Sequence, residues 1–204
     1  MDLLFTKLAP FLLPSAVIPV TTSAQATMVE FFNPQLNFYW MSSRESEKTA
    51  LDTLRDTQGN PLWYRTSYAF KTDPAVSGNT SPISRYFIPG AARNATRGST
   101  FYTALNADKA AITATGKERF SMLNCTDVPT KFFCNEGIDS FIALPIGVGA
   151  TSTCLPGEQR IWRAFRARPA DDGNHRYLTN QAMYDYMVNE MGWDGEFVNF
   201  CARL

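Results

Sequence analysis

Histidine is nearly missing from this chain of 204 residues, since His175 is its only one. A single imidazole argues against a multi-histidine metal centre, and the cysteines lack the short spacing of a zinc knuckle. The 19 basic residues are balanced by 19 acidic ones, which leaves no surplus positive charge for a nucleic-acid backbone. The G-x-S-x-G elbow of a serine hydrolase is also missing. We therefore expect no metal, no cofactor, no nucleic-acid partner and no enzymatic activity.

The residues that could still do hydrolytic chemistry are few. His175 would need a nucleophile beside it, and nothing in the sequence supplies one, so we expect a structural histidine. A carboxylate pair for glycoside hydrolysis could be drawn from Asp171, Asp172, Glu190 and Glu196, but the sequence does not fix their separation. Asp171 and Asp172 precede a glycine, a pattern typical of a hairpin turn. A hydrolase is the least favoured class.

Residues 1–26 differ from the rest of the chain. An apolar run over residues 8–20 contains Pro10, Pro14 and Pro19, which make it too short and too broken for a membrane-spanning helix. The run ends in an A-x-A pattern, which predicts a secretory signal peptide with a mature start at Thr27. The alternative is a retained apolar arm that packs on a neighbouring subunit. The sequence predicts one domain over residues 27–204.

Four cysteines are present, an even number that favours two disulfides in an exported protein. Among the three ways to pair them, we expect Cys125–Cys134 within an insertion and Cys154–Cys201 across a long loop. The longer loop removes more entropy from the unfolded chain. Together with the leader-like segment, the cysteines predict a secreted, extracellular or cell-surface protein.

The strongest internal signal is self-similarity, because one order of elements occurs three times. Apolar runs and turn residues predict strand–strand–helix–strand units over approximately 28–73, 82–144 and 154–204. The first strand begins at Val29, and the last one covers 193–201. A unit of this size cannot bury its apolar face alone. The predicted fold class is therefore α+β, with three repeats packed around a shared core in pseudo-threefold symmetry and stapled by disulfides.

Polar residues mark the start of each predicted helix. Ser43, Asn106 and Asn180 are the expected N-caps. The third helix is predicted over 181–191, with Met183, Tyr186 and Met187 among the residues of its apolar face. Recurring aromatic anchors are expected at three positions: Phe31, Tyr86 and Phe165; Tyr39, Tyr102 and Tyr177; Phe70, Phe141 and Phe200.

The third unit carries the residues of a known pattern. Gly173-Asn174-His175-Arg176-Tyr177-Leu178-Thr179, then Gly192-Trp193, Glu196 and Phe200-Cys201, resemble a bacterial secreted repeat family of unknown function with repeats like "VYRLYN…HFYT…GW…EGIAFY". The likeness covers roughly 28–204 and is looser in the second unit, where Phe132-Phe133-Cys134 stand in place of Gly-Trp. The resemblance implies export and association with cell-surface proteins or enzymes, and it implies no defined chemistry.

The aromatic side chains are the favoured contact residues, because their flat apolar faces pack against sugars or partner proteins. Alternation along a strand means that many of them point inward. The candidates are Tyr39, Trp40, Trp63, Tyr102, Trp162, Tyr177 and Trp193. The predicted function is a non-catalytic extracellular binding module for a glycan or cell-envelope polymer. The alternative is a subunit that self-assembles into a homo-oligomer, filament, sheath or surface layer.

Overall fold

The computed structural model describes residues 25–88, 99–120, 125, 132–166 and 173–204. Nearly all of the predicted leader or arm lies outside these residues, and so does the Asp171-Asp172 turn. Ten strands and three α-helices follow one another in the described chain, in the order β1 Ala26–Asn33, β2 Phe38–Ser42, α1 Glu45–Thr53, β3 Tyr64–Thr72, β4 Thr80–Ile88, β5 Ser99–Thr103, α2 Asn106–Ala114, β6 Glu118–Phe120, β7 Phe133–Ala143, β8 Glu158–Arg166, β9 Asn174–Leu178, α3 Gln181–Asn189 and β10 Asp194–Arg203. A short 3₁₀ turn, η3 Gly149–Thr151, precedes β8. The protein is thus mixed α and β, with sheet predominating.

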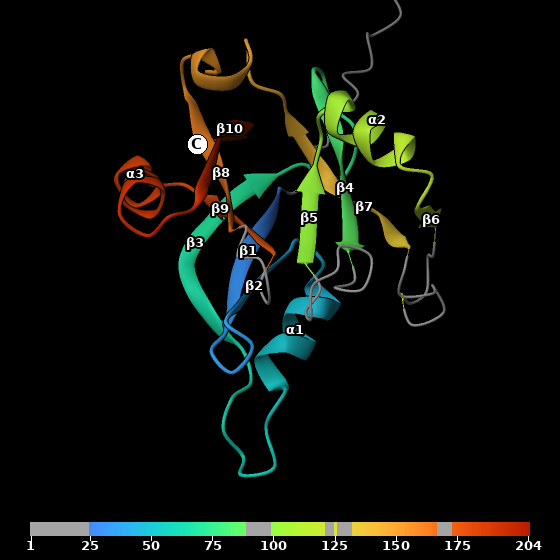
Figure 1. Cartoon of the computed structure of the whole chain (residues 1–204), viewed down its shortest axis with the longest axis vertical. Coiled ribbons are helices and arrows are strands. Elements are labelled where there is room, and N and C mark those ends of the chain that lie inside the picture. Colours follow the sequence, from blue (N-terminus) through green and yellow to red (C-terminus); the bar gives the residue numbers. More distant parts are fainter. Residues whose placement is uncertain (1–24, 89–98, 121–124, 126–131, 167–172) are drawn as a thin grey trace, which may run out of the picture.

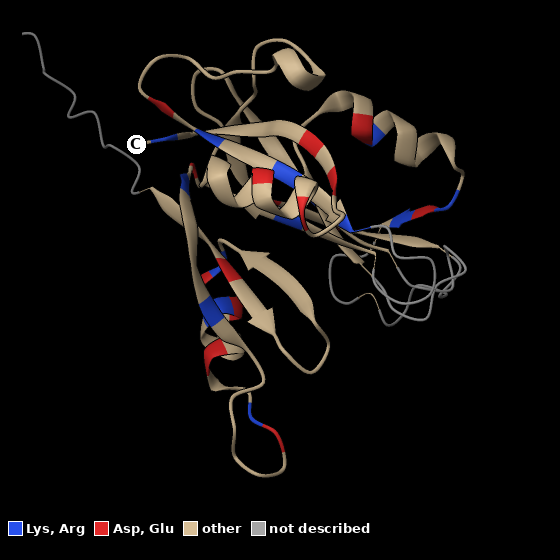
Figure 2. Cartoon of the chain, turned by 60° about the vertical axis from the view of Figure 1, so that its left-hand side comes forward, with Lys and Arg blue, Asp and Glu red and all other residues tan. Residues whose placement is uncertain are grey.

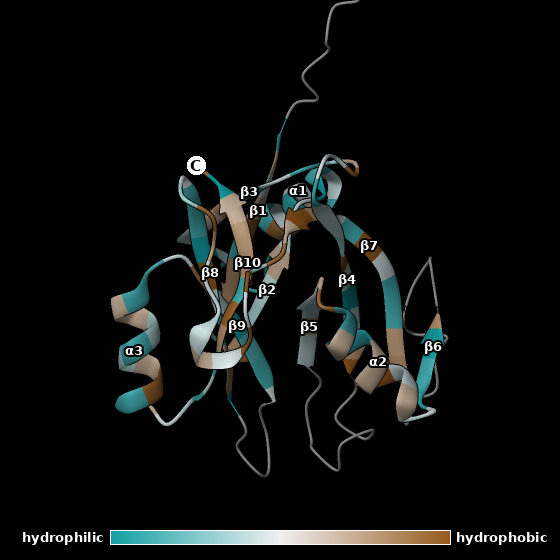
Figure 3. Ribbon diagram, turned by 90° about the horizontal axis from the view of Figure 1, so that it is seen from above, coloured by the Kyte–Doolittle hydropathy of each residue, from teal (hydrophilic) through white to brown (hydrophobic). Residues whose placement is uncertain are grey.

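Strands β1, β4 and β8 each lie in the middle of three antiparallel strands. The orders are β2-β1-β3, β5-β4-β7 and β10-β8-β9, and the last two groups belong to one seven-stranded sheet because β7 meets β10. Figures 1 and 3 show that this sheet curls, and that the three helices lie at separate places outside the strands. Among the described residues, no helix has both the length and the apolar character needed to cross a bilayer.

The helices begin close to the predicted places, but only one predicted cap is correct. The Asn180 side chain accepts a hydrogen bond from Met183 N–H at 3.0 Å. Ser43 does not cap α1, because its hydroxyl bonds instead to the carboxylate of Asp139 on β7. Asn106 is the first residue of α2 and not its cap. Tertiary contacts and turn geometry therefore decide two of the three starts.

The central core is formed where the three strand groups meet. Two edge-strand tyrosines join these groups through their hydroxyls: Tyr177 on β9 accepts from Tyr102 N–H at 2.8 Å, and Tyr102 on β5 accepts from Met41 N–H at 3.1 Å. Each hydroxyl also donates to the carbonyl of the same residue, which satisfies its polar groups in an apolar setting. The cluster consists of Met28, Met41, Phe70, Ile83, Tyr102, Ala104, Ile142, Ile161, Tyr177, Phe200 and Ala202.

The strand registers correct several of the predicted anchors. Tyr102 lies opposite Arg85 and Tyr177 opposite Arg163, whereas Tyr39 on β2 is half-buried outside the central core. Phe141 and Phe165, which were also predicted as anchors, are only half-buried, and in each case a neighbouring residue is buried instead. A shift of one residue turns a side chain to the opposite face of a sheet. Runs with several apolar residues in succession do not reveal that shift.

Buried arginines hold the helices to neighbouring strands, and Figure 2 shows charged residues on both kinds of element. Arg85 on β4 pairs with Glu47 of α1 at 2.6 Å. Arg163 on β8 pairs with Asp108 of α2 at 2.7 Å. Both arginines are at most 5% exposed, so these pairs lie in a low-dielectric setting. Removal of either partner would leave a buried charge uncompensated.

A third buried pair joins β1 to β9, and here the middle strand carries the carboxylate instead of the arginine. The carboxylate of Glu30 receives two hydrogen bonds from the guanidinium of Arg176, at 3.0 and 3.1 Å. Glu30 is completely buried, and burial raises the pKa of its carboxyl more than Arg176 lowers it.

Both predicted disulfides are present. Cys125–Cys134 spans nine residues inside the insertion, and Cys154–Cys201 spans 47 and fixes β10 to the segment before β8. The same insertion contains β6, a short strand that the sequence did not predict, which pairs parallel with β7.

Candidate functional site

A groove runs across the outer face of β8 and carries one of the predicted contact residues, Trp162. It consists of two adjoining hollows, of about 420 and about 490 Å³, and both are lined by Arg160 and Trp162. The first hollow extends to α3 and β10, where Tyr184 and Phe197 line it. The second extends over the segment 154–159 to Thr179. We call the two together the Trp162 groove.

Alternation along β8 explains why Trp162 faces outward. Its neighbours Ile161 and Arg163 are buried on the inner side, while Trp162 itself is half-buried. The ring of Tyr184 lies beside it, with ring centroids 6.4 Å apart and planes tilted by 31°. The two rings form an aromatic wall between the strand and the helix.

A glycine allows the Tyr184 ring to reach this position. At Gly195 of β10, a Cβ atom would clash with the Tyr184 hydroxyl. The hydroxyl accepts a hydrogen bond from Phe197 N–H at 3.1 Å. Burial raises the pKa of Tyr184 above its ordinary value, so the hydroxyl is neutral near pH 7.

Phe197 has an uncommon backbone conformation. Its φ is +62°, and Asn37 is the only other non-glycine residue with positive φ in the described chain. This region costs a residue with a Cβ about 1–2 kcal/mol. The Phe197 ring is nevertheless 41% exposed and lies against Gly149 of η3. Strained backbone positions cluster at functional sites, so Phe197 is a candidate contact residue of the groove.

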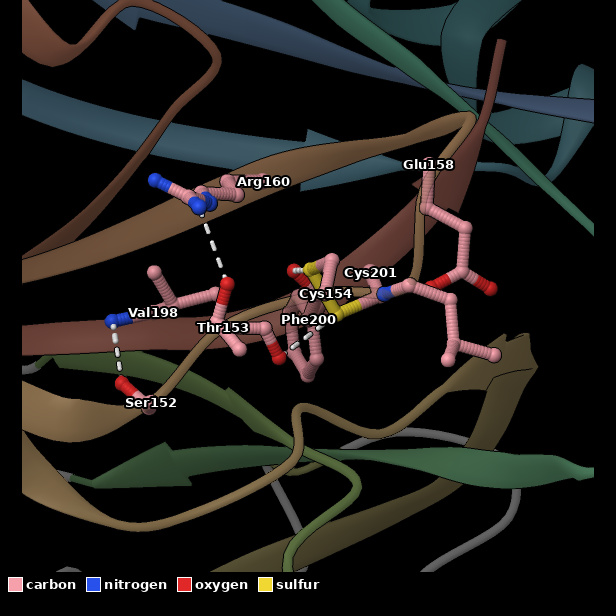
Figure 4. Close-up of a disulfide and its surroundings, with 9 residues drawn as sticks. Ser152, Thr153, Cys154, Glu158, Arg160, Val198, Phe200 and Cys201 are labelled. Carbon is pink, nitrogen blue, oxygen red and sulfur yellow. Dashed lines mark hydrogen bonds between the residues drawn. A yellow bond between two sulfur atoms is a disulfide. The ribbon is translucent and has the colours of Figure 1, made fainter.

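Cys154 lines the second hollow, and its disulfide to Cys201 ties this side of the groove to β10 (Figure 4). Beside it, Arg160 donates to Thr153 Oγ1 at 2.9 Å, and the Ser152 hydroxyl accepts from Val198 N–H at 3.2 Å. These bonds and the disulfide hold the segment before β8 against β10. The groove is therefore largely pre-formed, which lowers the entropy lost when a ligand binds.

The other six predicted contact aromatics do not line this groove. Tyr102, Tyr177 and Trp193 are buried, with 4% exposure or less, so their assignment as contact residues was wrong. Tyr39, Trp40 and Trp63 are half-buried. Trp40 and Trp63 pack edge to face over α1, with centroids 6.5 Å apart. Tyr39 stacks on Phe32 and lies beneath the guanidinium of Arg176.

Tyr184 and Phe197 were missed for different reasons. The predicted apolar face of α3 included Tyr186, but Tyr186 is 54% exposed and Tyr184 is buried together with Met187. Both tyrosines lie within one turn, and only packing against β10 decides between them. The strain at Phe197 has no sequence signal, because β-bulges with positive φ ordinarily carry glycine.

His175 lies in a separate small cavity of about 200 Å³. Its Nδ1 is 3.3 Å from the Ser99 hydroxyl, and its Nε2 is 3.8 Å from a carboxylate oxygen of Glu196. The order of groups resembles a hydrolytic triad, but Ser99 has no exposed surface from which to attack a substrate. The same Glu196 oxygen accepts from Arg163 at 2.7 Å. This geometry supports a structural role.

A second arrangement that resembles a functional site is also accounted for. Cys154, Glu158 and Cys201 lie close enough together to suggest a metal site. Their sulfurs are joined in the disulfide and hence are not thiolate ligands.

Comparison with known proteins gives no independent assignment: no protein-family profile matches the chain, and neither the curated proteins nor the solved structures contain a significant match.

Proposed function

We propose that this protein is a non-catalytic extracellular binding module, and that the Trp162 groove binds a glycan or cell-envelope polymer. The single observation that carries the proposal is Phe197, a strained and exposed ring at the mouth of a groove lined by Trp162 and Tyr184. Flat rings flanked by polar groups suit the apolar C–H faces and hydroxyls of sugars. Arg160, Gln181 and Asp185 supply those polar groups.

An extracellular location fits the two disulfides, which form and persist in oxidising compartments.

We also propose that the chain consists of three related units arranged as a ring with pseudo-threefold symmetry. Each unit has a middle strand flanked by two antiparallel partners and a helix of nine residues. In register, Glu30, Arg85 and Arg163 occupy corresponding places on the middle strands. Membership of the secreted repeat family that the sequence resembles is part of this proposal.

The buried pairs support the ring. Arg85 reaches back to the first unit, where it pairs with Glu47 and lies over the Trp40 ring at 5.1 Å. Arg163 reaches back to the second unit in the same way, where it pairs with Asp108 and lies over Phe101 at 4.8 Å.

The arginines lie over the rings of Trp40 and Phe101 in the first two units, and the register places Arg176 at the corresponding position of the third unit. Arg176 pairs with Glu30 of the first unit. Three related contacts would thus close one ring.

The same correspondence distinguishes the third helix from the other two. Lys48 of α1 and Lys109 of α2 occupy the helical place of Tyr184, counted from each N-cap. Their ammonium groups donate to the carbonyls of Thr27 and Pro82, at 3.2 and 2.9 Å. In the first two units a lysine bonded to the backbone therefore stands where the third unit has the Tyr184 ring.

Retention of the protein on immobilised glycans and on purified cell-wall polymers tests the proposed function. Wild-type protein is expected to be retained, and Trp162→Ala is expected to lose retention. Trp63→Ala is the matched control, because Trp63 is also half-buried but lies beside α1. Circular dichroism of both variants checks folding. Failure of the wild-type protein to bind any polymer would refute the proposal.

Self-assembly is the second candidate, favoured by exposed apolar side chains on the segment between β7 and β8. Ile146, Val148 and Leu155 are 55%, 83% and 46% exposed. Clustered apolar side chains at a surface mark contact regions. Size-exclusion chromatography and electron microscopy test it, and a monomer at every concentration would count against it.

A further inference from the structure

We infer that the Trp162 groove takes an internal segment of a linear, uncharged glycan, with sugars on both sides of Trp162, and that each chain binds one such segment. This inference rests on the proposed function and specifies its ligand class.

The extent of the groove carries the first step. Each hollow alone has a volume within the range of small-molecule sites, about 300–1,000 Å³. They share Trp162 and Arg160, so a ligand that occupies both must pass across the indole. A terminal sugar would fill one hollow and leave the other to water. A chain of sugars fills both and covers the aromatic wall.

The charges carry the second step. Arg160 borders both hollows, and each hollow adds one carboxylate, Asp185 in the first and Glu158 in the second. The groove as a whole therefore has one cation and two carboxylates, and it lacks the surplus cations with which proteins hold anionic polymers. Hydroxyl groups of an uncharged sugar can donate to the carboxylates and accept from Gln181 or Gln159.

The third step concerns the number of sites. Lys48 and Lys109 stand at the place of Tyr184 in the other two helices and bond to backbone carbonyls, so among the described helices only the third presents an aromatic ring from this place to a groove. The binding stoichiometry should be one glycan segment per chain, although the fold contains three similar strand groups.

Isothermal titration calorimetry with β-1,4-linked glucose and N-acetylglucosamine oligomers, from the monosaccharide to the hexasaccharide, tests the inference. Affinity should rise at least about tenfold from the monosaccharide to the tetrasaccharide and then level off, as stacking on both sides of Trp162 is completed. One oligomer should bind per chain. Affinity should change less than about twofold between about 0.05 and about 0.5 M salt, since no net charge is neutralised.

Matched variants separate the two hollows. Gln181→Ala and Gln159→Ala remove one polar group from the first and second hollow, and each should weaken tetrasaccharide binding several-fold. Gln58→Ala, in the exposed loop after α1, is the control and should bind as the wild type does. A monosaccharide that binds as tightly as the tetrasaccharide, or salt-sensitive binding of an anionic polymer only, overturns the inference and leaves the binding function intact. Binding to no glycan at all overturns both.

Discussion

Replacing Phe197 by alanine and by glycine separates backbone strain from ring contacts. Both substitutions remove the ring, but only glycine relieves the positive φ of +62°. Relief is worth about 1–2 kcal/mol, and the greater freedom of glycine in the unfolded chain opposes it by about 0.5–1 kcal/mol. Phe197→Gly should therefore be more stable than Phe197→Ala by roughly 0.5–1 kcal/mol, a sign opposite to that at an ordinary strand position.

Phe87 of β4 supplies the comparison, because it is half-buried and is not among the residues with positive φ. There the alanine variant should be the more stable, by about 0.5–1 kcal/mol. Urea unfolding at 25 °C gives the free energies. Thermal melts give a second reading, with a shift of about 2–4 °C for each kcal/mol in a chain of this size.

The assay has a clear refutation. If Phe197→Ala is more stable than Phe197→Gly by about 0.5–1 kcal/mol, as expected for Phe87, the conformation at Phe197 is not strained, and its place in the groove is a matter of packing. Glycan retention adds an independent reading, since both variants lack the ring. We expect the two variants of Phe197 to lose retention equally even though their stabilities differ.

Three further predictions concern the disulfides and the buried pair. Replacing Cys154 and Cys201 together by serine should lower the free energy of unfolding by about 4 kcal/mol, against about 2.5 kcal/mol for the shorter disulfide, because their sequence separations are 47 and 9. Because folding raises the pKa of Glu30, its contribution to stability is full below its ordinary pKa of 4.5 and falls as pH rises through the folded pKa; urea titrations should show wild type losing stability relative to Glu30→Gln as pH rises. Glu30→Arg alone should lower the urea concentration at which the chain unfolds. The triple variant Glu30→Arg, Arg176→Phe and Met183→Glu copies the arrangement of the other two units and should recover most of the lost stability. If it recovers none, the proposed repeat is contradicted.

The order of elements could be predicted because it is written in local patterns. Alternating apolar residues, the Asn180 cap and turn residues mark the nine strands that belong to the three groups and all three helices. The cysteine pairs followed from loop length. Two of the three caps could not be predicted: Asn106 is the first residue of α2, and Ser43 is engaged by Asp139 of β7, which is 96 positions away.

The groove could be predicted only in part, for a physical reason. The sequence shows that Trp162 is aromatic and lies in a predicted strand, which placed it among seven candidate contact residues but did not separate it from the other six. It does not show which aromatic of α3 meets β10, because that depends on the missing Cβ of Gly195. Nor does it show that Phe197 has positive φ. These features arise from contacts between elements, and local patterns do not contain them.

The groove and the reversed ion pair have a common origin under the proposed repeat. In α1, Glu47 is held by an arginine of the next unit, and the following residue, Lys48, covers the space beside the helix. In α3, the corresponding consecutive residues are Met183 and Tyr184. Once the guanidinium is supplied by Arg176 on a strand, the helix needs no acid at the first position. The second position holds tyrosine in place of lysine, and this tyrosine gives the groove its aromatic wall. The reversed ion pair and the groove thus occur together at the third helix.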